Sequence, residues 1–263
     1  MSKEKPDFME AGYGETVVLI HSSVAGAKQW RSLMDLLANH FHVVAINLLG
    51  YGKTRAWPDR RPQTLEDQAK LIEAFLPSDG SKISVVGHSF GGSVAMKAAQ
   101  IYKNQVRRLV LIEPNPFYLL EQQALSKGYQ EAVRLRDTIK ENGKSGFWEN
   151  AAETFANYWT GAGSWDAMPA DRRSKFAEAL KPNFYEWDAV MNEQTPLSEW
   201  GRDLPKDTTV ISAADTVRSI DEIIGLMRDN FLDWNFETVV RGGHMAIMSN
   251  PENLNPIVAR GLS

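Results

Sequence analysis

Residues 82–102 read KISVVGHSFGGSVAMKAAQIY and contain the stretch that decides the fold. An apolar, β-branched run precedes Gly87-His88-Ser89-Phe90-Gly91-Gly92, and apolar residues at helical spacing follow it. Such a pattern predicts a tight strand-to-helix turn, where small neighbours are needed because other backbone comes close. N–H groups at the start of the helix would then face the Ser89 hydroxyl, where negative charge can develop. We expect Ser89 to be a nucleophile; the alternative is a glycine-rich turn with an idle serine.

Strand-like runs recur on both sides of this turn and alternate with helical patterns. This alternation is typical of parallel β-α-β units. The expected strands are Val17–Ile20, Val43–Asn47, Ile83–Gly87, Arg108–Ile112, Thr208–Ser212 and Phe236–Val240, with an antiparallel edge strand at Phe8–Ala11. The expected helices between them are Trp30–Ala38, Leu65–Phe75 and Ser93–Tyr102. The sequence therefore predicts the α/β class, with a mostly parallel, doubly wound sheet.

The alternation stops between about Asn115 and Asp203. The stretch reads as several helices with breaks at Gly143, at Gly161 to Gly163 and at Pro182. We expect residues 115–202 to form a helical cap, inserted after the strand ending near Ile112 into a core of residues 1–114 and 203–263. A cap there would lie over the sheet edge where parallel sheets bind ligands. Five of the eight tryptophans fall in this stretch: Trp148, Trp159, Trp165, Trp187 and Trp200. Trp148, Trp159 and Trp187 are candidates to line a pocket, or they form the cap's own core.

A nucleophilic serine needs a base to accept its proton. Of the five histidines, His244 follows Gly242-Gly243 beyond the last predicted strand, in a loop that can reach Ser89. His88 adjoins Ser89, and we expect its ring to point away from the turn. The other three are assigned to loop-shaping, edge or surface positions: His21, His40 and His42. His244 is the predicted general base.

The base in turn needs a carboxylate to fix its tautomer. Asp215 follows the strand-like TTVIS and precedes His244 by 29 residues, room for one helix and one strand. Glu113 follows the strand-like RLVLI and is the rival candidate. Either carboxylate could instead cap a turn or a helix. The sequence favours Asp215.

Five segments together resemble the α/β-hydrolase superfamily, in its branch with a helical cap. Besides the turn at Ser89, four segments carry the resemblance: His21-Ser22-Ser23 through Trp30, Asn47–Gly52, Ser212–Asp215, and Gly243-His244 with Asn250-Pro251-Glu252. They are similar to the family's His-Gly…Trp loop, its Asp-x-x-Gly-x-Gly turn, its acid loop and its terminal histidine loop. The match covers residues 1–113 and 205–263. Three positions depart from the family pattern: Ser22 and Ser212 replace glycine, and Asn47 replaces aspartate.

The resemblance implies an oxyanion hole made of the backbone N–H groups of Ser23 and Phe90, and the chain order Ser89, Asp215, His244 agrees with it. Ser22 and His88 are further candidates to line the substrate site. Relatives of this fold that are haloalkane dehalogenases or epoxide hydrolases attack with aspartate, which Ser89 argues against. Thioester or lactone hydrolysis, and the lyases and perhydrolases that share the triad, stay open. We expect hydrolysis of a small, largely apolar carboxylic ester, with C–C hydrolysis of ring-fission diketones as the alternative and a ligand receptor with little turnover as the alternative of another class.

Composition narrows the partners. The net charge of −4 gives no electrostatic reason to expect nucleic acid or an anionic membrane. With no cysteine, disulfides, thiol catalysis and cysteine-based metal sites are excluded. The charged N-terminus has no apolar signal segment, and no run reaches the ~20 apolar residues of a membrane span. We expect a cytoplasmic protein with a small-molecule substrate and neither cofactor nor metal; the sequence predicts no oligomeric state.

Overall fold

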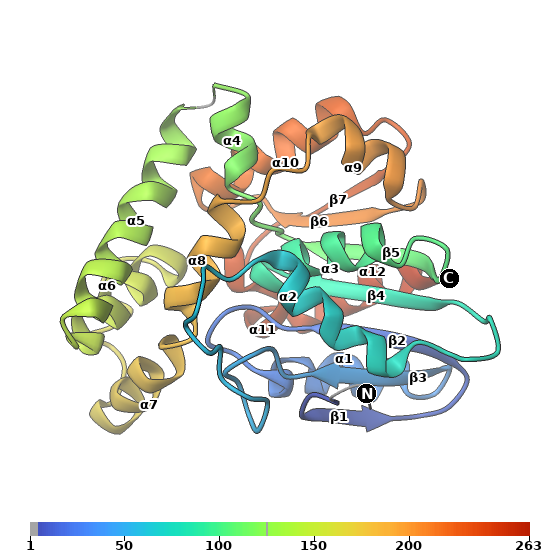
Figure 1. The fold of residues 1–263 in the computed structure, drawn as a ribbon, viewed down its shortest axis with the longest axis horizontal. Coiled ribbons are helices and arrows are strands. Elements are labelled where there is room, and N and C mark those ends of the chain that lie inside the picture. The colour runs from blue at the N-terminus through green and yellow to red at the C-terminus, as the bar shows by residue number, and fades with distance from the viewer. Residues whose placement is uncertain (1–4, 125) are drawn as a thin grey trace.

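A seven-stranded sheet forms the centre of the molecule in the computed structural model, which describes residues 5–124 and 126–263 (Figure 1). The strands are β1 (Phe8–Ala11), β2 (Glu15–Ile20), β3 (Phe41–Ile46), β4 (Ile83–His88), β5 (Val106–Ile112), β6 (Thr209–Ala213) and β7 (Asn235–Val239). Their order is β1-β3-β2-β4-β5-β6-β7, with β1 antiparallel to β3 and every other pair parallel. The predicted fold class and the antiparallel edge strand are confirmed.

Helices cover both faces of this sheet (Figure 1). Those outside the segment between β5 and β6 are η1 (Ala27–Trp30), α1 (Arg31–Leu37), α2 (Leu65–Ala69), η2 (Lys70–Phe75), α3 (Phe90–Ile101), α10 (Arg218–Asn230), η3 (Gly243–Met245), α11 (Ala246–Ser249) and α12 (Pro251–Leu262). Alternate residues of β2 enter two separate cores: Val18 and Ile20 on one face, Val17 and Leu19 on the other. Burial of both faces explains why the central strands are continuous apolar runs.

Six helices lie between β5 and β6 in the part of the chain that the structure describes. They are α4 (Tyr118–Gln122), α5 (Ser126–Lys144), α6 (Trp148–Thr160), α7 (Ala170–Leu180), α8 (Asn183–Met191) and α9 (Leu197–Asp203). Helices α5 to α8 gather at the left of Figure 1, beyond the carboxyl ends of the parallel strands. The division of the chain into a core and a cap stays a prediction, which we take up below.

The predicted break at Gly143 is found two residues later, at residues 145–147. Helix α5 continues through Gly143 to Lys144. A Cβ added at Gly143 would come within 2.9 Å of ring atoms of Phe184 and Trp148. The glycine therefore allows close side-chain packing against α5 rather than ending the helix.

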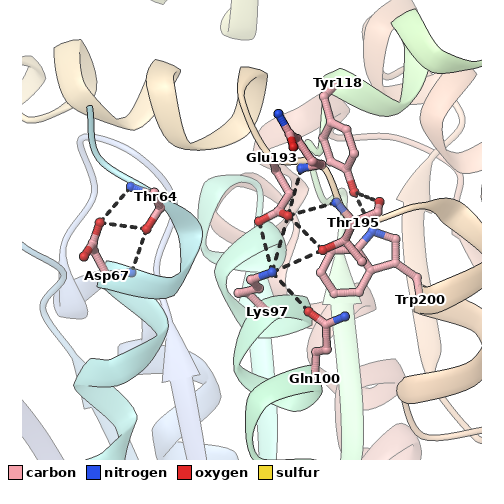
Figure 2. A network of polar contacts seen from close by, with 9 residues as sticks. Thr64, Asp67, Lys97, Gln100, Tyr118, Glu193, Thr195 and Trp200 are labelled. Carbon is pink, nitrogen blue, oxygen red and sulfur yellow. Dashed lines mark hydrogen bonds and ion pairs between the residues drawn. The ribbon is translucent and has the colours of Figure 1, made fainter. Parts of the chain in front are cut away.

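The chain that returns from α8 to α9 is tied to α3, the helix that begins directly after Ser89 (Figure 2). The Lys97 ammonium on α3 lies 3.2 Å from the Glu193 carboxylate and donates to Thr195 Oγ1 at 3.1 Å. Tyr118 donates to the Thr195 carbonyl and accepts from Trp200 Nε1, both at 2.6 Å. These contacts fix the base of the inserted segment on the sheet-bearing part of the chain.

Figure 2 also shows the Thr64–Asp67 capping box that begins α2.

Candidate active site

Ser89 lies in a strained turn between β4 and α3. Its φ of 54° places a non-glycine residue in the left-handed region, and its N–H donates to the Ile112 carbonyl at 2.9 Å. A Cβ at Gly87 would lie 2.2 Å from the Gly91 carbonyl oxygen, and one at Gly91 would lie 2.2 Å from the Ile20 carbonyl oxygen. Neither position has room for a side chain, so the turn has the tight backbone approach that its glycines predict.

The structure brings His244 to this serine. His244 is in η3, beyond β7, and its Nε2 lies 2.8 Å from Ser89 Oγ. The ring is 3% exposed and lies against the Trp159 indole, with centroids 4.1 Å apart. Gly242 and Gly243, with φ of 123° and 54°, make the turn that carries the histidine back over the sheet. His244 is thus in position to accept the hydroxyl proton.

Glu113 occupies the other side of the imidazole. Its Oε2 lies 2.7 Å from His244 Nδ1 and accepts from Thr216 Oγ1 at 2.6 Å, while Oε1 accepts from the Ala213 N–H at 2.7 Å. The side chain is 2% exposed. A carboxylate can only accept, so Nδ1 carries the hydrogen in the neutral ring and Nε2 is left to accept from Ser89. This is the hydrogen-bond sequence that activates a serine.

The expected contact between Asp215 and His244 is wrong. Asp215 is exposed, and its carboxylate accepts from the N–H groups of Gly243 at 2.8 Å and Gly242 at 3.3 Å. The hydrogen bond from Gly243 is the largest of the effects that hold the pKa of Asp215 below its usual value. Asp215 therefore fixes the backbone of the histidine loop, and the ring belongs to Glu113.

Two further histidines lie buried close to this site. Desolvation lowers the pKa of His88 to about 3 and that of His21 to about 4, so both are neutral near pH 7. His88 Nε2 donates to the His244 carbonyl at 2.9 Å, and His21 bridges Ser22 and Leu48 through the Ser22 carbonyl at 2.7 Å and the Leu48 N–H at 3.0 Å. Both histidines therefore hold loop backbone in place next to the site. His88 does not line the pocket described below, contrary to expectation; its ring is fully buried and hydrogen-bonded to the His244 carbonyl.

Ser23 and Phe90, whose N–H groups were expected to form an oxyanion hole, both line the pocket. Among the described residues, no hydrogen-bond acceptor is found for either N–H. Ser22, the residue at the unusual non-glycine position, donates through its Oγ to Gln29 Oε1 at 2.7 Å. Two unpaired N–H donors next to a nucleophile are suited to receive a developing oxyanion.

A cavity of about 260 Å³ opens onto the Ser89 and His244 side chains. Its lining from the inserted segment joins an apolar set to a polar one. The apolar members are Phe155, Ala156, Trp159, Phe176, Trp187 and Val190, and the polar members are Asn115, Thr160, Arg172, Asn183 and Glu186. Ser22, Trp159 and Trp187 line it as expected, whereas Trp148 does not. Trp148 and Trp159 share a face of α6, but eleven residues separate them by about 16 Å along the axis. Trp148 instead packs edge-on against Phe184, with centroids 6.4 Å apart.

A buried polar cluster on one side of the cavity was missed from sequence. Glu186 of α8 is 1% exposed, and its carboxylate accepts from Ser23 Oγ at 2.5 Å, Asn183 Nδ2 at 2.9 Å and Tyr51 Oη at 2.8 Å. Desolvation raises the pKa of Glu186, and these three hydrogen bonds oppose that rise. Glu186 stands in the aromatic run NFYEWDAVM, where nothing local distinguishes it from a surface glutamate.

The sequence matches the alpha/beta hydrolase family over residues 17–257. The chain is an α/β hydrolase. Among curated relatives, 2-hydroxy-6-oxo-6-(2'-aminophenyl)hexa-2,4-dienoic acid hydrolase of Metapseudomonas resinovorans is 39% identical over 114 residues, 40% of this chain and 37% of that protein. Pimeloyl-(acyl-carrier protein) methyl ester esterase of Proteus mirabilis is 32% identical over 108 residues, 41% of this chain and 40% of that protein. The matched stretches thus span less than half the length of these relatives.

Solved structures extend the likeness of the fold to almost the whole chain. The esterase of Exiguobacterium antarcticum superposes with a TM-score of 0.78 at 16% identity, covering 97% of this chain and 95% of that one.

Within the described residues of this α/β hydrolase, no helix is both long and apolar enough to cross a bilayer. In the same residues, no group of three or more histidine, aspartate or glutamate side chains is arranged to hold a metal ion.

Proposed function

We propose that this α/β hydrolase cleaves a small, largely apolar carboxylic ester through an acyl-enzyme, with Ser89 as nucleophile, His244 as general base and Glu113 as the orienting acid. The continuous hydrogen-bond path from Glu113 through His244 to Ser89, at the floor of an apolar cavity, carries this proposal. Glu113 replaces the acid that the sequence favoured.

In the first half-reaction Ser89 Oγ attacks the ester carbonyl while His244 Nε2 takes the hydroxyl proton. The Glu113 carboxylate stabilises the imidazolium so formed, and the N–H groups of Ser23 and Phe90 bind the oxyanion. The C–O bond then breaks, and His244 returns its proton to the leaving alcohol. Water repeats the sequence on the acyl-enzyme and releases the carboxylic acid.

The inserted helices would act as the cap that selects the substrate. Pockets for drug-sized ligands commonly enclose about 300–1,000 Å³. A cavity of about 260 Å³, lined from α6, α7 and α8 by aromatic and aliphatic side chains together with a few polar ones, fits a short acyl chain or a single aryl group.

C–C hydrolysis of a ring-fission diketone is the second candidate. Its supporting observation is the 39% identity to the Metapseudomonas resinovorans hydrolase, whose name describes a dienoic acid of that kind. The Proteus mirabilis relative and the Exiguobacterium antarcticum structure are named as esterases. A panel of aryl esters of increasing acyl length, assayed beside a vinylogous ring-fission diketone, decides between the two: the larger kcat/KM identifies the reaction.

Ser89→Ala tests the nucleophile. Removing a triad serine costs about 10⁶ in kcat in the protease case, so we expect ester turnover to fall by at least about 10⁴ with folding retained. A phosphonate ester should add one covalent mass, which peptide mapping places at Ser89. Ser93→Ala, one turn further along α3, is the matched control. Full turnover by Ser89→Ala, labelling elsewhere, or a wild type that binds esters without multiple turnover would contradict the proposal, the last outcome favouring a ligand receptor.

A further inference from the structure

The loop after β2 is held in an unusual way at three successive residues. The Ser22 hydroxyl and N–H both reach Gln29 Oε1, at 2.7 and 3.2 Å. The Ser23 hydroxyl donates to the Glu186 carboxylate, and the Val24 N–H donates to Tyr51 Oη at 3.0 Å. Only the Ser23 N–H, between these ties, finds no acceptor among the described residues. These hydrogen bonds hold the loop and leave the Ser23 N–H free to donate to an oxyanion.

The backbone at this point does not hold its shape by itself. Val24 has a φ of 70°, in a region that a β-branched residue rarely occupies and at a cost of order 1–3 kcal/mol. A residue in such a conformation persists only where its surroundings fix it. Here the fixing bond comes from Tyr51, whose own hydroxyl donates to Glu186 at 2.8 Å.

Both restraints therefore meet at one carboxylate. Glu186 accepts from Ser23 through Oε2 and from Tyr51 through Oε1, and Asn183 Nδ2 adds a third hydrogen bond to Oε2. The carboxylate is 1% exposed, and no lysine or arginine among the described residues pairs with it. Burying a carboxyl group is costly unless its oxygens are hydrogen-bonded, so the three donors stabilise Glu186 in this position.

We propose that Glu186 is a positioning residue that sets the direction of the Ser23 N–H, and with it the oxyanion hole, from helix α8 of the inserted segment. This inference rests on the proposed function, because it takes Ser23 as an oxyanion donor. In this role Glu186 acts through Ser23 and Tyr51, although its side chain also lines the cavity. The geometry of the oxyanion hole then depends on where α8 sits.

A graded series at position 186 tests the proposal. Glu186→Met keeps the side-chain length but removes both accepting oxygens, and Glu186→Gln keeps one. Loss of one oxyanion donor costs about 10²–10³ in kcat, so a displaced donor should cost about 10–100-fold in Glu186→Met and less in Glu186→Gln. KM for a short aryl ester should stay within about threefold, because ground-state binding is not involved.

Phenylboronic acid supplies a readout that a merely structural role would not change. It adds to the serine oxygen and presents a tetrahedral oxygen to the oxyanion hole. Its inhibition constant should rise across the series in proportion to the fall in kcat/KM. 4-Nitrophenyl acetate, which has no hydrogen-bond donor, should show the same loss as an ester bearing a hydroxyl group.

Glu193→Met is the matched control. Glu193 follows the same helix α8 and also accepts several hydrogen bonds, but it contacts Lys97 and Thr195 outside the cavity. We expect it to lower thermal stability and to leave the boronate inhibition constant within about twofold. Tyr51→Phe keeps the ring that packs on His21 and removes the bridge to Glu186, so it carries the test if Glu186→Met does not fold.

The outcomes are separable. Normal boronate affinity and kcat in Glu186→Met and Tyr51→Phe overturn the inference alone, as does a loss confined to the hydroxyl-bearing ester, which would make Glu186 a substrate contact. A wild type that turns over no ester and binds no boronate overturns the proposed function and the inference with it. Parallel, graded losses in kcat and boronate affinity support the inference.

Discussion

Strands β5 and β6 run side by side in the same direction, and each ends in a carboxylate, yet the two carboxylates have opposite surroundings. Glu113 directly follows β5, is buried, and lies against the His244 ring. Asp215 comes two residues after the end of β6, is exposed, and accepts hydrogen bonds from backbone N–H groups of the histidine loop. Lying at the carboxyl edge of the sheet is therefore not enough to bring a carboxylate to the His244 ring.

The two carboxylates differ in their depth below the surface. The Ala213 N–H, at the end of β6, donates to Glu113, so the Glu113 side chain occupies the buried position beside the end of β6 and Asp215 lies outside it. Glu113 holds the imidazole ring, and Asp215 holds the loop that carries it. In the proposed mechanism both act on His244: Glu113 acts on the reacting ring, and Asp215 acts on the loop that supports the ring.

Glu113→Gln should have the largest effect of any change at these two positions. The amide keeps the shape but can present a donor to Nδ1, which favours the tautomer that cannot accept from Ser89; the equivalent change in a serine protease costs about 10⁴ in kcat. We expect a loss of about 10³–10⁴ in kcat for an aryl ester with an unchanged fold by circular dichroism. A loss below tenfold would mean that Glu113 does not orient the base.

Asp215→Asn should cost far less activity. The amide oxygen still accepts from Gly243, so the histidine loop keeps most of its position, and we expect kcat to fall by at most about tenfold, the scale of one supporting hydrogen bond. The same esterase assay measures it beside Glu113→Gln. Equal losses in the two variants would mean that Glu113 and Asp215 do not have different roles. A larger loss in Asp215→Asn would identify Asp215, after β6, as the acid.

The fold could be predicted because its signals are local. The turn at Ser89 and the apolar strand runs depend on residues close together in the chain, and the observed strands agree with the predictions to within two residues. The choice between Glu113 and Asp215 could not be made that way. Both follow strand-like runs, and the outcome depends on how the ends of β5, β6 and the histidine loop meet in space.

The polar cluster at Glu186 shows the same limit more strongly. Its partners Ser23 and Tyr51 lie 163 and 135 residues away in the chain. The prediction that Trp148 lines the pocket is wrong for a related reason. Helical periodicity predicts the face of α6 on which a residue lies but not its distance from the site along the helix, so Trp148 and Trp159 were equal candidates from sequence. Contacts between distant segments, rather than any local pattern, decide these roles.

The smallest expected effect concerns how Asp215 contributes to stability as pH changes. Hydrogen bonds from Gly243 and Gly242 favour its charged form, so its pKa in the folded protein lies below the ordinary unfolded value of about 3.9. Between these two values the unfolded chain binds more protons, and the free energy of unfolding therefore rises with pH. The contribution is complete above the unfolded pKa and is lost as pH falls through the folded pKa.

Asp215→Asn should thus be less stable than wild type by an amount that is constant from pH 7 to pH 5 and shrinks only below about pH 4. Because Asp215 is exposed, solvent screening keeps the difference under about 1 kcal/mol. Urea unfolding at pH 7, 5 and 3.5 measures it, with exposed Asp229→Asn on α10 as the control. A difference that grew as the pH fell would show that the Asp215 charge opposes folding. A loss in the free energy of unfolding well above 1 kcal/mol at pH 7 would mean that Asp215 stabilises more of the protein than the histidine loop. Asp215 would then differ less from the buried Glu113 in its importance to the structure.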